Sequence, residues 1–246
     1  TFGPGRHIHD MSLWNAEEDQ FVMRAAFVTQ QWALDVPMME LIDLFHVDQM
    51  SEQKKSRWIH HYKECVKRQL LLNGGDRIHL SKNPLMSGWV ETLINKFPGA
   101  CIVVVVRDPT QCIPSVLKLM ETKWKSSGWL KQDYSGSLLA LTAISFETFH
   151  NPRDVLARYP STPQIAIDYR KLTTEPRATV LDVYNALGMT VSPQFDGYLV
   201  AQEERERGHK TPFHYSIEDY ALSPERIELE LGEFFDQYQW PRGEES

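Results

Sequence analysis

The chain has 246 residues, of which 42% are hydrophobic and 24% are charged, so the sequence predicts one globular domain over residues 1–246. Its formal net charge of −7 argues against a surface that coats nucleic acid, because binding to a phosphate backbone needs clustered Lys and Arg. Any phosphate group that this protein binds must therefore be held locally.

The cysteines and the apolar runs exclude several other classes of protein. The three cysteines, Cys65, Cys101 and Cys112, show no C-x-x-C spacing and are odd in number, which indicates neither a disulfide framework nor a zinc site. We therefore expect a reducing compartment, the cytoplasm.

The longest apolar run, residues 101–106, is far shorter than the ~20 residues of a membrane helix. The chain opens at Thr1 rather than Met, and its first residues show no signal-peptide pattern. We therefore expect the chain to be a fragment or a processed form.

The first part of the chain predicts helices and then a strand–helix–strand unit. Apolar residues recur at helical spacing in residues 15–32, 38–45 and 51–72, and the last of these stops at the breaker Asn73-Gly74-Gly75. Strands are predicted at 77–81 and 100–106, with a helix at 85–96 between them. The run 101–106 is apolar and rich in β-branched residues, which is typical of a parallel strand covered on both faces.

The second part continues this alternation of helices and strands. A helix is predicted after Pro109, a mobile loop at 123–136, a helix at 138–149 and a buried strand at 164–169. Helices follow at 175–187, 193–206 and 224–238, with a loop at 207–215. Together these elements predict a helix-rich α/β fold with a short parallel sheet flanked by helices.

Arg107, Asp108 and Pro109 form the most informative local pattern. A buried parallel strand delivers its last residues to the edge where α/β proteins bind ligands, so Arg107 should face that edge. Pro109 suits the first turn of a helix and Asp108 can cap it, while Ser115 lies farther along the same helix. The helix start and the guanidinium together predict a phosphate site. The alternative is an Arg-Asp pair that only caps the helix.

Here the sequence resembles the PAPS-dependent sulfotransferase superfamily, in which the motif R-D-P-x-x-x-x-x-S binds the 3′-phosphate of PAPS. This chain carries the motif complete from Arg107 to Ser115, and further segments agree in order at residues 80–84, 97–100, 167–172, 185–188 and 214–225. The resemblance covers about residues 80–238. It implies a P-loop-like sulfotransferase fold, transfer of a sulfuryl group from PAPS to a hydroxyl or amine, PAP as the product, and no metal.

The resemblance also implies roles for individual residues. Arg107 and Ser115 would hold the 3′-phosphate, Tyr169 would lie near the adenine, and Lys210 would close over the nucleotide. Lys82 resembles the lysine that, in protein-tyrosine sulfotransferases, neutralises the sulfuryl group and the departing phosphate oxygen. The structural alternatives are a core tyrosine for Tyr169 and solvated surface lysines for Lys82 and Lys210.

The chain departs from the family pattern in two places. Many relatives have a histidine where this chain has Met86, and Met86 cannot take a proton from the acceptor, so another general base is needed. His9 is our candidate, with His7 and Glu17 as alternatives. No loop of the P-K-S-G-T type and no Walker motif occurs in the chain. We therefore expect the first strand and its 5′-phosphosulfate loop to precede Thr1, and this fragment alone to bind PAPS poorly.

The sequence is compatible with several acceptors and with more than one general class of function. A carbohydrate, a lipid, a small alcohol and a peptide tyrosine are all possible acceptors, because acceptor pockets are built from variable loops. We expect Trp14, Trp32, Trp124 and Trp129 to give that pocket aromatic walls. The alternative functions are a phosphotransferase-type nucleotide-binding protein, which needs a Walker loop upstream, and a non-catalytic protein that binds a partner through the same scaffold.

Overall fold

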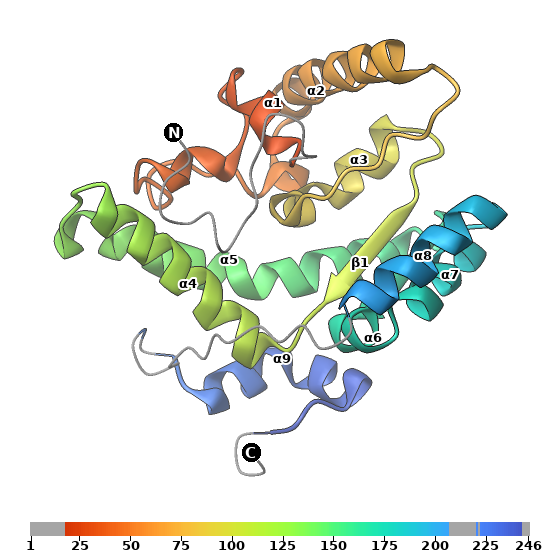
Figure 1. The fold of residues 1–246 in the computed structure, drawn as a ribbon. Helices are drawn as coiled ribbons and strands as arrows, with labels where there is room; N and C mark the ends of the chain where they lie inside the picture. Colours follow the sequence, from red (N-terminus) through yellow and green to blue (C-terminus); the bar gives the residue numbers. More distant parts are fainter. Residues whose placement is uncertain (1–17, 207–219, 221, 243–246) are drawn as a thin grey trace.

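The computed structural model describes residues 18–206, 220 and 222–242, and in this part of the chain helices surround a short parallel sheet (Figure 1). The elements, with η for a 3-10 helix, are α1 (Gln20–Arg24), η2 (Gln30–Leu34), η3 (Val47–Gln49), α2 (Glu52–Asn73), η4 (Pro84–Trp89), α3 (Val90–Lys96), β1 (Ile102–Val106), α4 (Pro109–Ser126), α5 (Lys131–Arg158), β2 (Gln164–Asp168), α6 (Tyr169–Thr174), α7 (Pro176–Ala186), α8 (Pro193–Glu206) and α9 (Pro224–Tyr238). None of the described helices is long and apolar enough to cross a membrane.

Strands β1 and β2 run parallel, and their register pairs Ile102 with Gln164 at one end of the sheet and Val106 with Asp168 at the other. Alternate residues of a strand point to opposite faces. On one face, β1 packs against a cluster of buried residues from α3 and α5. On the other face, Val103 and Val105 are 40% and 49% exposed, while α6 and α7 contact β2.

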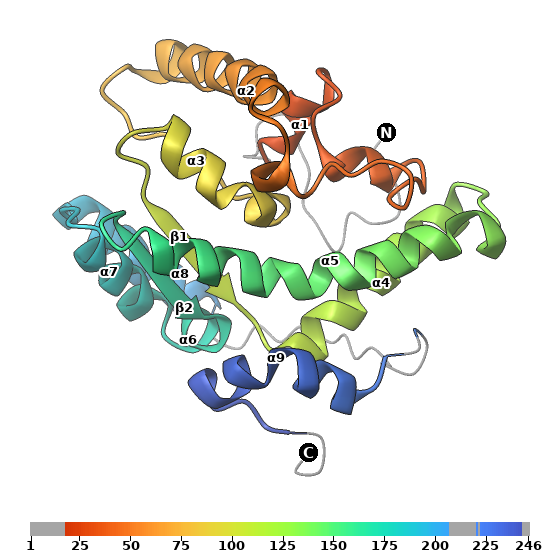
Figure 2. The ribbon, with the colours of Figure 1, turned by 180° about the vertical axis from the view of Figure 1, so that it is seen from behind.

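Helix α5 crosses the middle of the molecule, with α1–α3 on one side and α9 on the other (Figures 1 and 2). It contacts η4, α3, α4 and α9. The largest core cluster lies along α4, α5 and α9 and contains the fully buried Trp124, Tyr134 and Phe235. The indole nitrogen Nε1 of Trp124 donates a hydrogen bond of 2.6 Å to the carbonyl of Ala33. Trp124 is therefore a core residue, and the prediction that it forms a pocket wall is wrong.

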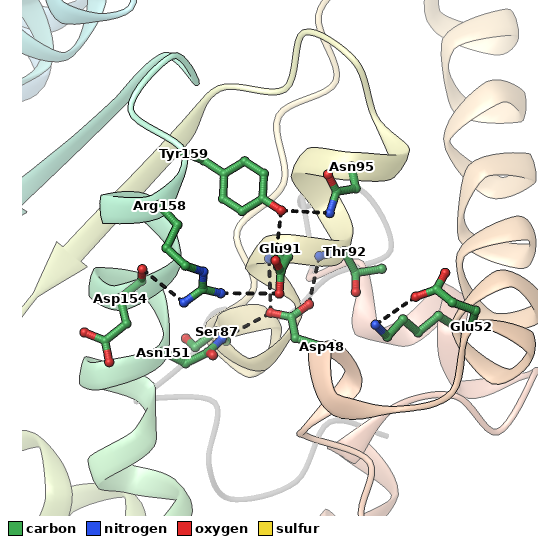
Figure 3. Close-up of polar contacts among 11 residues, drawn as sticks. Asp48, Glu52, Ser87, Glu91, Thr92, Asn95, Asn151, Asp154, Arg158 and Tyr159 are labelled. Carbon is green, nitrogen blue, oxygen red and sulfur yellow. Dashed lines mark hydrogen bonds and ion pairs between the residues drawn. The ribbon is translucent and has the colours of Figure 1, made fainter.

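A network of hydrogen bonds connects η4 and α3, which precede β1, with α5 (Figure 3). The carboxylate of Asp48 accepts hydrogen bonds from the backbone amides of Glu91 at 3.0 Å and Thr92 at 2.8 Å, in the first turn of α3. From α5, the side-chain amide of Asn151 reaches Asp48 at 3.3 Å and the carbonyl of Ser87 at 2.6 Å. These contacts hold η4 and α3 in place and thereby fix where the chain enters β1.

The structure confirms the predicted fold class, a helix-rich α/β domain with a short parallel sheet, but it changes several elements. Residues 77–81 were expected to form a strand and instead lie in an irregular segment, 74–83, without a partner strand among the described residues. Residues 38–45 form turns rather than a helix. The helix expected at 15–32 is interrupted because Phe27 has a positive φ of 56° and the Thr29 side chain caps η2.

The loop expected at 123–136 is also wrong, because α4 continues to Ser126 and α5 begins at Lys131. Gly128, with a φ of 89°, allows the tight reversal between these two helices. The backbone amide of Leu130 donates to the carboxylate of Asp133 at 2.9 Å, which caps the start of α5. The polar and aromatic composition of this segment thus reflects two helix ends rather than a loop.

Candidate functional site

A cavity of about 260 Å³ lies at the carboxyl edge of the sheet, where β1 and β2 both end. It is bounded by both strand ends, the start of α4 and the residues that follow α9. The lining residues are Arg107, Asp108, Gln111, Asp168, Tyr169, Arg170, Trp240 and Pro241. Open parallel sheets bind their ligands at this edge. The predicted position of Arg107 at a ligand-binding edge therefore agrees with the geometry.

Asp108 caps helix α4, as the sequence predicts. Its Oδ1 accepts from the backbone amide of Thr110 at 2.9 Å and from the Thr110 hydroxyl at 2.6 Å, and Pro109 occupies the first turn. Asp108 is 7% exposed. The carboxylate is thus engaged by its own helix, while the other amides of the first turn and the positive end of the helix dipole favour an anion at this edge.

Arg107 brings a guanidinium with spare donors into the cavity. Its Nη2 donates to Oε1 of Gln111 at 3.3 Å, and the group lies 5.1 Å from the ring centroid of Tyr169. Its Nε is buried and has no hydrogen-bond partner among the described residues. Because an unsatisfied buried donor costs about 1–3 kcal/mol, Nε needs an acceptor that the described residues do not supply.

Asp168 and Arg170 line the same cavity as Arg107 and neutralise each other. Oδ2 of Asp168 accepts from Nε of Arg170 at 2.8 Å and from its Nη2 at 2.6 Å, and Oδ1 accepts from the Arg170 amide at 2.8 Å. Burial opposes ionisation of this carboxyl, but the hydrogen bonds and charge of Arg170 outweigh burial and hold the pKa of Asp168 below its usual value. Two arginines line the cavity. Arg170 is paired with Asp168, whereas Arg107 makes no ion pair within the described part of the chain.

Cys112 is not a nucleophile for this site. Burial raises the pKa of its thiol to about 12, although the charge of Arg107 acts in the opposite direction. The Sγ atom contacts the carbonyl of Arg107 at 3.7 Å. The thiol therefore stays protonated and is a poor nucleophile.

The structure brings Tyr169 to Arg107 and places Ser115 nearby in the fold. Tyr169 is the first residue of α6, directly after β2, rather than the last residue of the predicted strand. Ser115 is four residues after Gln111 and so shares its face of α4, one turn farther from the strand. It does not line the cavity, and its hydroxyl has no hydrogen-bond partner in the described residues. Its role toward a phosphate stays a prediction.

The remaining predicted site residues lie elsewhere. Lys82 is in the irregular segment 74–83, its side chain is 75% exposed and it forms an ion pair with Glu18, and it does not line this cavity. His9 and Lys210 lie outside the described residues. Within the described ranges there is no group of three or more His, Cys, Asp or Glu side chains that could hold a metal ion.

Sequence reasoning missed five lining residues, which are Gln111, Asp168, Arg170, Trp240 and Pro241. Gln111 lies four residues after Arg107, and the expected helix start could have suggested that contact. Trp240 and Pro241 come from the far end of the chain, and no local pattern connects them with β1.

Comparison with known proteins identifies the family. The sequence profile of the sulfotransferase family matches residues 5–193, which is more than half of the chain. The proteins named omega-hydroxy-beta-dihydromenaquinone-9 sulfotransferase Stf3 from strains of Mycobacterium bovis and Mycobacterium tuberculosis are each 22% identical over 241 residues, covering 95% of this chain and 60% of the relative. The chain thus spans about 60% of the length of these curated relatives.

The fold agrees with this relationship. The crystal structure of sulfotransferase STF9 from Mycobacterium avium superposes with a TM-score of 0.71 at 15% identity, over 96% of this chain and 62% of that chain. At this identity the likeness concerns the fold, whereas the profile match concerns the sequence. The chain belongs to the sulfotransferase family.

Proposed function

We propose that this protein is a PAPS-dependent sulfotransferase that moves a sulfuryl group from PAPS to a hydroxyl or amine of an acceptor. The observation that carries the proposal is the Arg107 guanidinium at the carboxyl edge of the sheet, with a buried Nε that lacks a partner among the described residues. The family match supports sulfuryl transfer as the reaction class.

The residues present fit the nucleotide part of PAPS. Arg107 would bind the 3′-phosphate through its free donors, assisted by the start of α4 and by the Ser115 hydroxyl. Tyr169, which stacks against Arg107, would lie against the adenine, and Lys210 would close over the nucleotide. When bound, PAPS supplies the activated sulfuryl group.

Lys82 would neutralise charge on the sulfuryl group as it moves. Its ion pair with Glu18 is at the surface, where such a pair is worth about 0–1 kcal/mol, so the ammonium group can leave Glu18 at little cost. Preorganised positive charge at the transferring group is usually the largest single contribution to catalysis. His9, the candidate base from the sequence, would take the proton of the acceptor hydroxyl.

The 5′-phosphosulfate loop would come from chain that precedes Thr1, as part of a third strand beside β1. Supporting this, the apolar side chains Val103 and Val105 of β1 are half exposed, and Ile78 and Leu80 of the irregular segment are 74% and 91% exposed. Burial of such surface by a further strand and its helix would be favourable. Calorimetric titration with PAP should give weak binding to this chain and tight binding to a longer protein; equally tight binding to both would refute this part of the proposal.

The acceptor that we favour is an apolar molecule with a hydroxyl group. The curated relatives are named for a hydroxylated dihydromenaquinone, which is lipid-like. A carbohydrate, a small alcohol and a peptide tyrosine are the alternatives to be tested. The cytoplasmic location also stays a prediction, in keeping with three cysteines whose thiols are free.

The direct test is transfer of radiolabelled sulfate from PAPS to four probe acceptors, namely farnesol, 4-nitrophenol, glucose and a tyrosine peptide. We expect sulfation of farnesol to exceed that of the sugar and the peptide. Transfer from the γ-phosphate of ATP instead would favour the phosphotransferase alternative. A protein that binds no PAP and sulfates none of the probes would overturn the proposal and favour the non-catalytic alternative.

A further inference from the structure

A second cluster of polar side chains lies where the irregular segment 74–83 passes the start of α1. Nε2 of His79 is 3.0 Å from Oδ2 of Asp19, and the hydroxyl of Tyr62, from α2, donates to the same oxygen at 2.5 Å. The side chains of His79 and Asp19 are 23% and 15% exposed. This is a histidine oriented by a carboxylate, with partial access from solvent.

The geometry fixes which nitrogen of His79 carries the proton. Burial, and next the hydrogen bond and charge of Asp19, raise the pKa of Tyr62, so the phenol keeps its proton and donates it to Asp19. A carboxylate that accepts from Tyr62 also accepts from Nε2–H of His79. In the neutral ring this leaves the lone pair on Nδ1 of His79, an atom with no hydrogen-bond partner in the described part of the chain.

His46 provides a contrast within the same protein. Its Nδ1 lies 2.9 Å from Asp43 and its Nε2 lies 2.8 Å from Glu147, so both ring nitrogens are engaged by carboxylates. Such a ring links two parts of the fold and has no nitrogen available for a substrate. His79, with one nitrogen held and one available, has the arrangement of an oriented base.

The position of His79 relative to Lys82 adds a second argument. The two residues belong to the same segment, and their side chains contact the consecutive residues Asp19 and Glu18. Because consecutive Cα atoms are only about 3.8 Å apart, both contacts lie beside the start of α1. A group that neutralises the sulfuryl oxygens and a group that can take a proton would then flank the same reacting centre.

We infer that His79, oriented by Asp19, is the general base for the acceptor hydroxyl, an inference that rests on the proposed function. The acceptor oxygen forms a bond to the sulfur of PAPS while the bond from sulfur to the 5′-phosphate oxygen breaks. PAP leaves with that electron pair, and the hydroxyl proton moves to Nδ1 of His79. Asp19 does not take the proton; it stabilises the imidazolium through the hydrogen bond to Nε2. In this assignment His79, rather than His9, is the general base, a role that Met86 cannot fill.

The kinetic test compares acceptors that need a base with one that does not. In the full-length protein, His79→Gln keeps a donor toward Asp19 but cannot take a proton, and we expect kcat with farnesol to fall about 100-fold or more. With 4-nitrophenol at alkaline pH, where the phenol is already ionised, the fall should be less than about 10-fold. His46→Gln is the matched control and should leave both rates within about 3-fold, since it alters a histidine that only links carboxylates.

A readout independent of turnover keeps the inference testable if the variant is unstable. Ring-nitrogen NMR of the parent protein should show Nε2 protonated and Nδ1 bare, and Asp19→Asn should disturb this tautomer while melting temperature reports the fold. Imidazole added to His79→Gly should restore farnesol sulfation. The inference would be refuted if the parent protein and His79→Gln sulfate farnesol equally well while His9→Gln does not. That result would leave the proposed function intact. A parent protein without sulfotransfer would remove both.

Discussion

Replacing Arg107 by Met should separate ligand binding from stability. The change keeps an apolar stem against Tyr169 and removes every guanidinium donor, including the buried Nε that has no partner among the described residues. Its one side-chain hydrogen bond to a described residue, to Gln111 at 3.3 Å, is long. Since the protein itself satisfies this group poorly, we expect the melting temperature to stay the same or to rise slightly.

Arg107→Met should greatly weaken the binding of nucleotides that carry a 3′-phosphate and hardly affect nucleotides that lack it. A hydrogen bond to a charged group contributes about 1.5–3 kcal/mol, so losing the contact to the 3′-phosphate should weaken binding of PAP about 10- to 150-fold. Adenosine 5′-phosphate lacks the 3′-phosphate, and its Kd should change less than about 3-fold. Calorimetric titrations of both nucleotides into the full-length parent protein and Arg107→Met measure this difference directly.

A matched control and a clear contrary result complete the test. Arg158→Met removes a surface arginine that pairs with Glu91 at 3.3 Å, away from the cavity lining, and should leave both Kd values unchanged. Arg107→Lys keeps the charge without the planar fork and should fall between the parent protein and Arg107→Met. If Arg107→Met remains folded and binds PAP as tightly as the parent protein does, the cavity is not the 3′-phosphate site.

Three further predictions concern stability. Trp124→Ala should lower the free energy of unfolding by about 3–5 kcal/mol in urea titrations, because this fully buried ring is removed from the main core. Gly88→Ala should cost about 1–3 kcal/mol or more by the same measurement, because a Cβ there would lie 2.2 Å from the carbonyl oxygen of Phe45. Because the folded-state pKa of Asp168 is depressed from 3.8, its pairing with Arg170 stabilises the fold above that pH and the contribution is lost as pH falls through the folded value. Arg170→Met should therefore lower the melting temperature near neutral pH, and the difference from the parent protein should shrink in acid.

The elements with strong local signals could be predicted from the sequence. The apolar β-branched run became β1, and the Asp108-Pro109 pair began α4 with the expected side-chain cap. These outcomes follow because caps and strand patterns act between near neighbours in the chain. The same reasoning placed Arg107 at the carboxyl edge of a parallel sheet, and the cavity lies there.

Contacts between distant residues could not be predicted in this way, because they depend on how the whole chain packs. Trp240 joins Arg107 at the cavity from the far end of the chain, and His79 meets Asp19 across 60 residues of sequence. The segment 77–81 has a strand-like pattern, yet a strand exists only where a neighbour pairs with it, and no such neighbour is present among the described residues. Local patterns set conformational preferences, whereas packing of the whole chain selects the contacts that satisfy them.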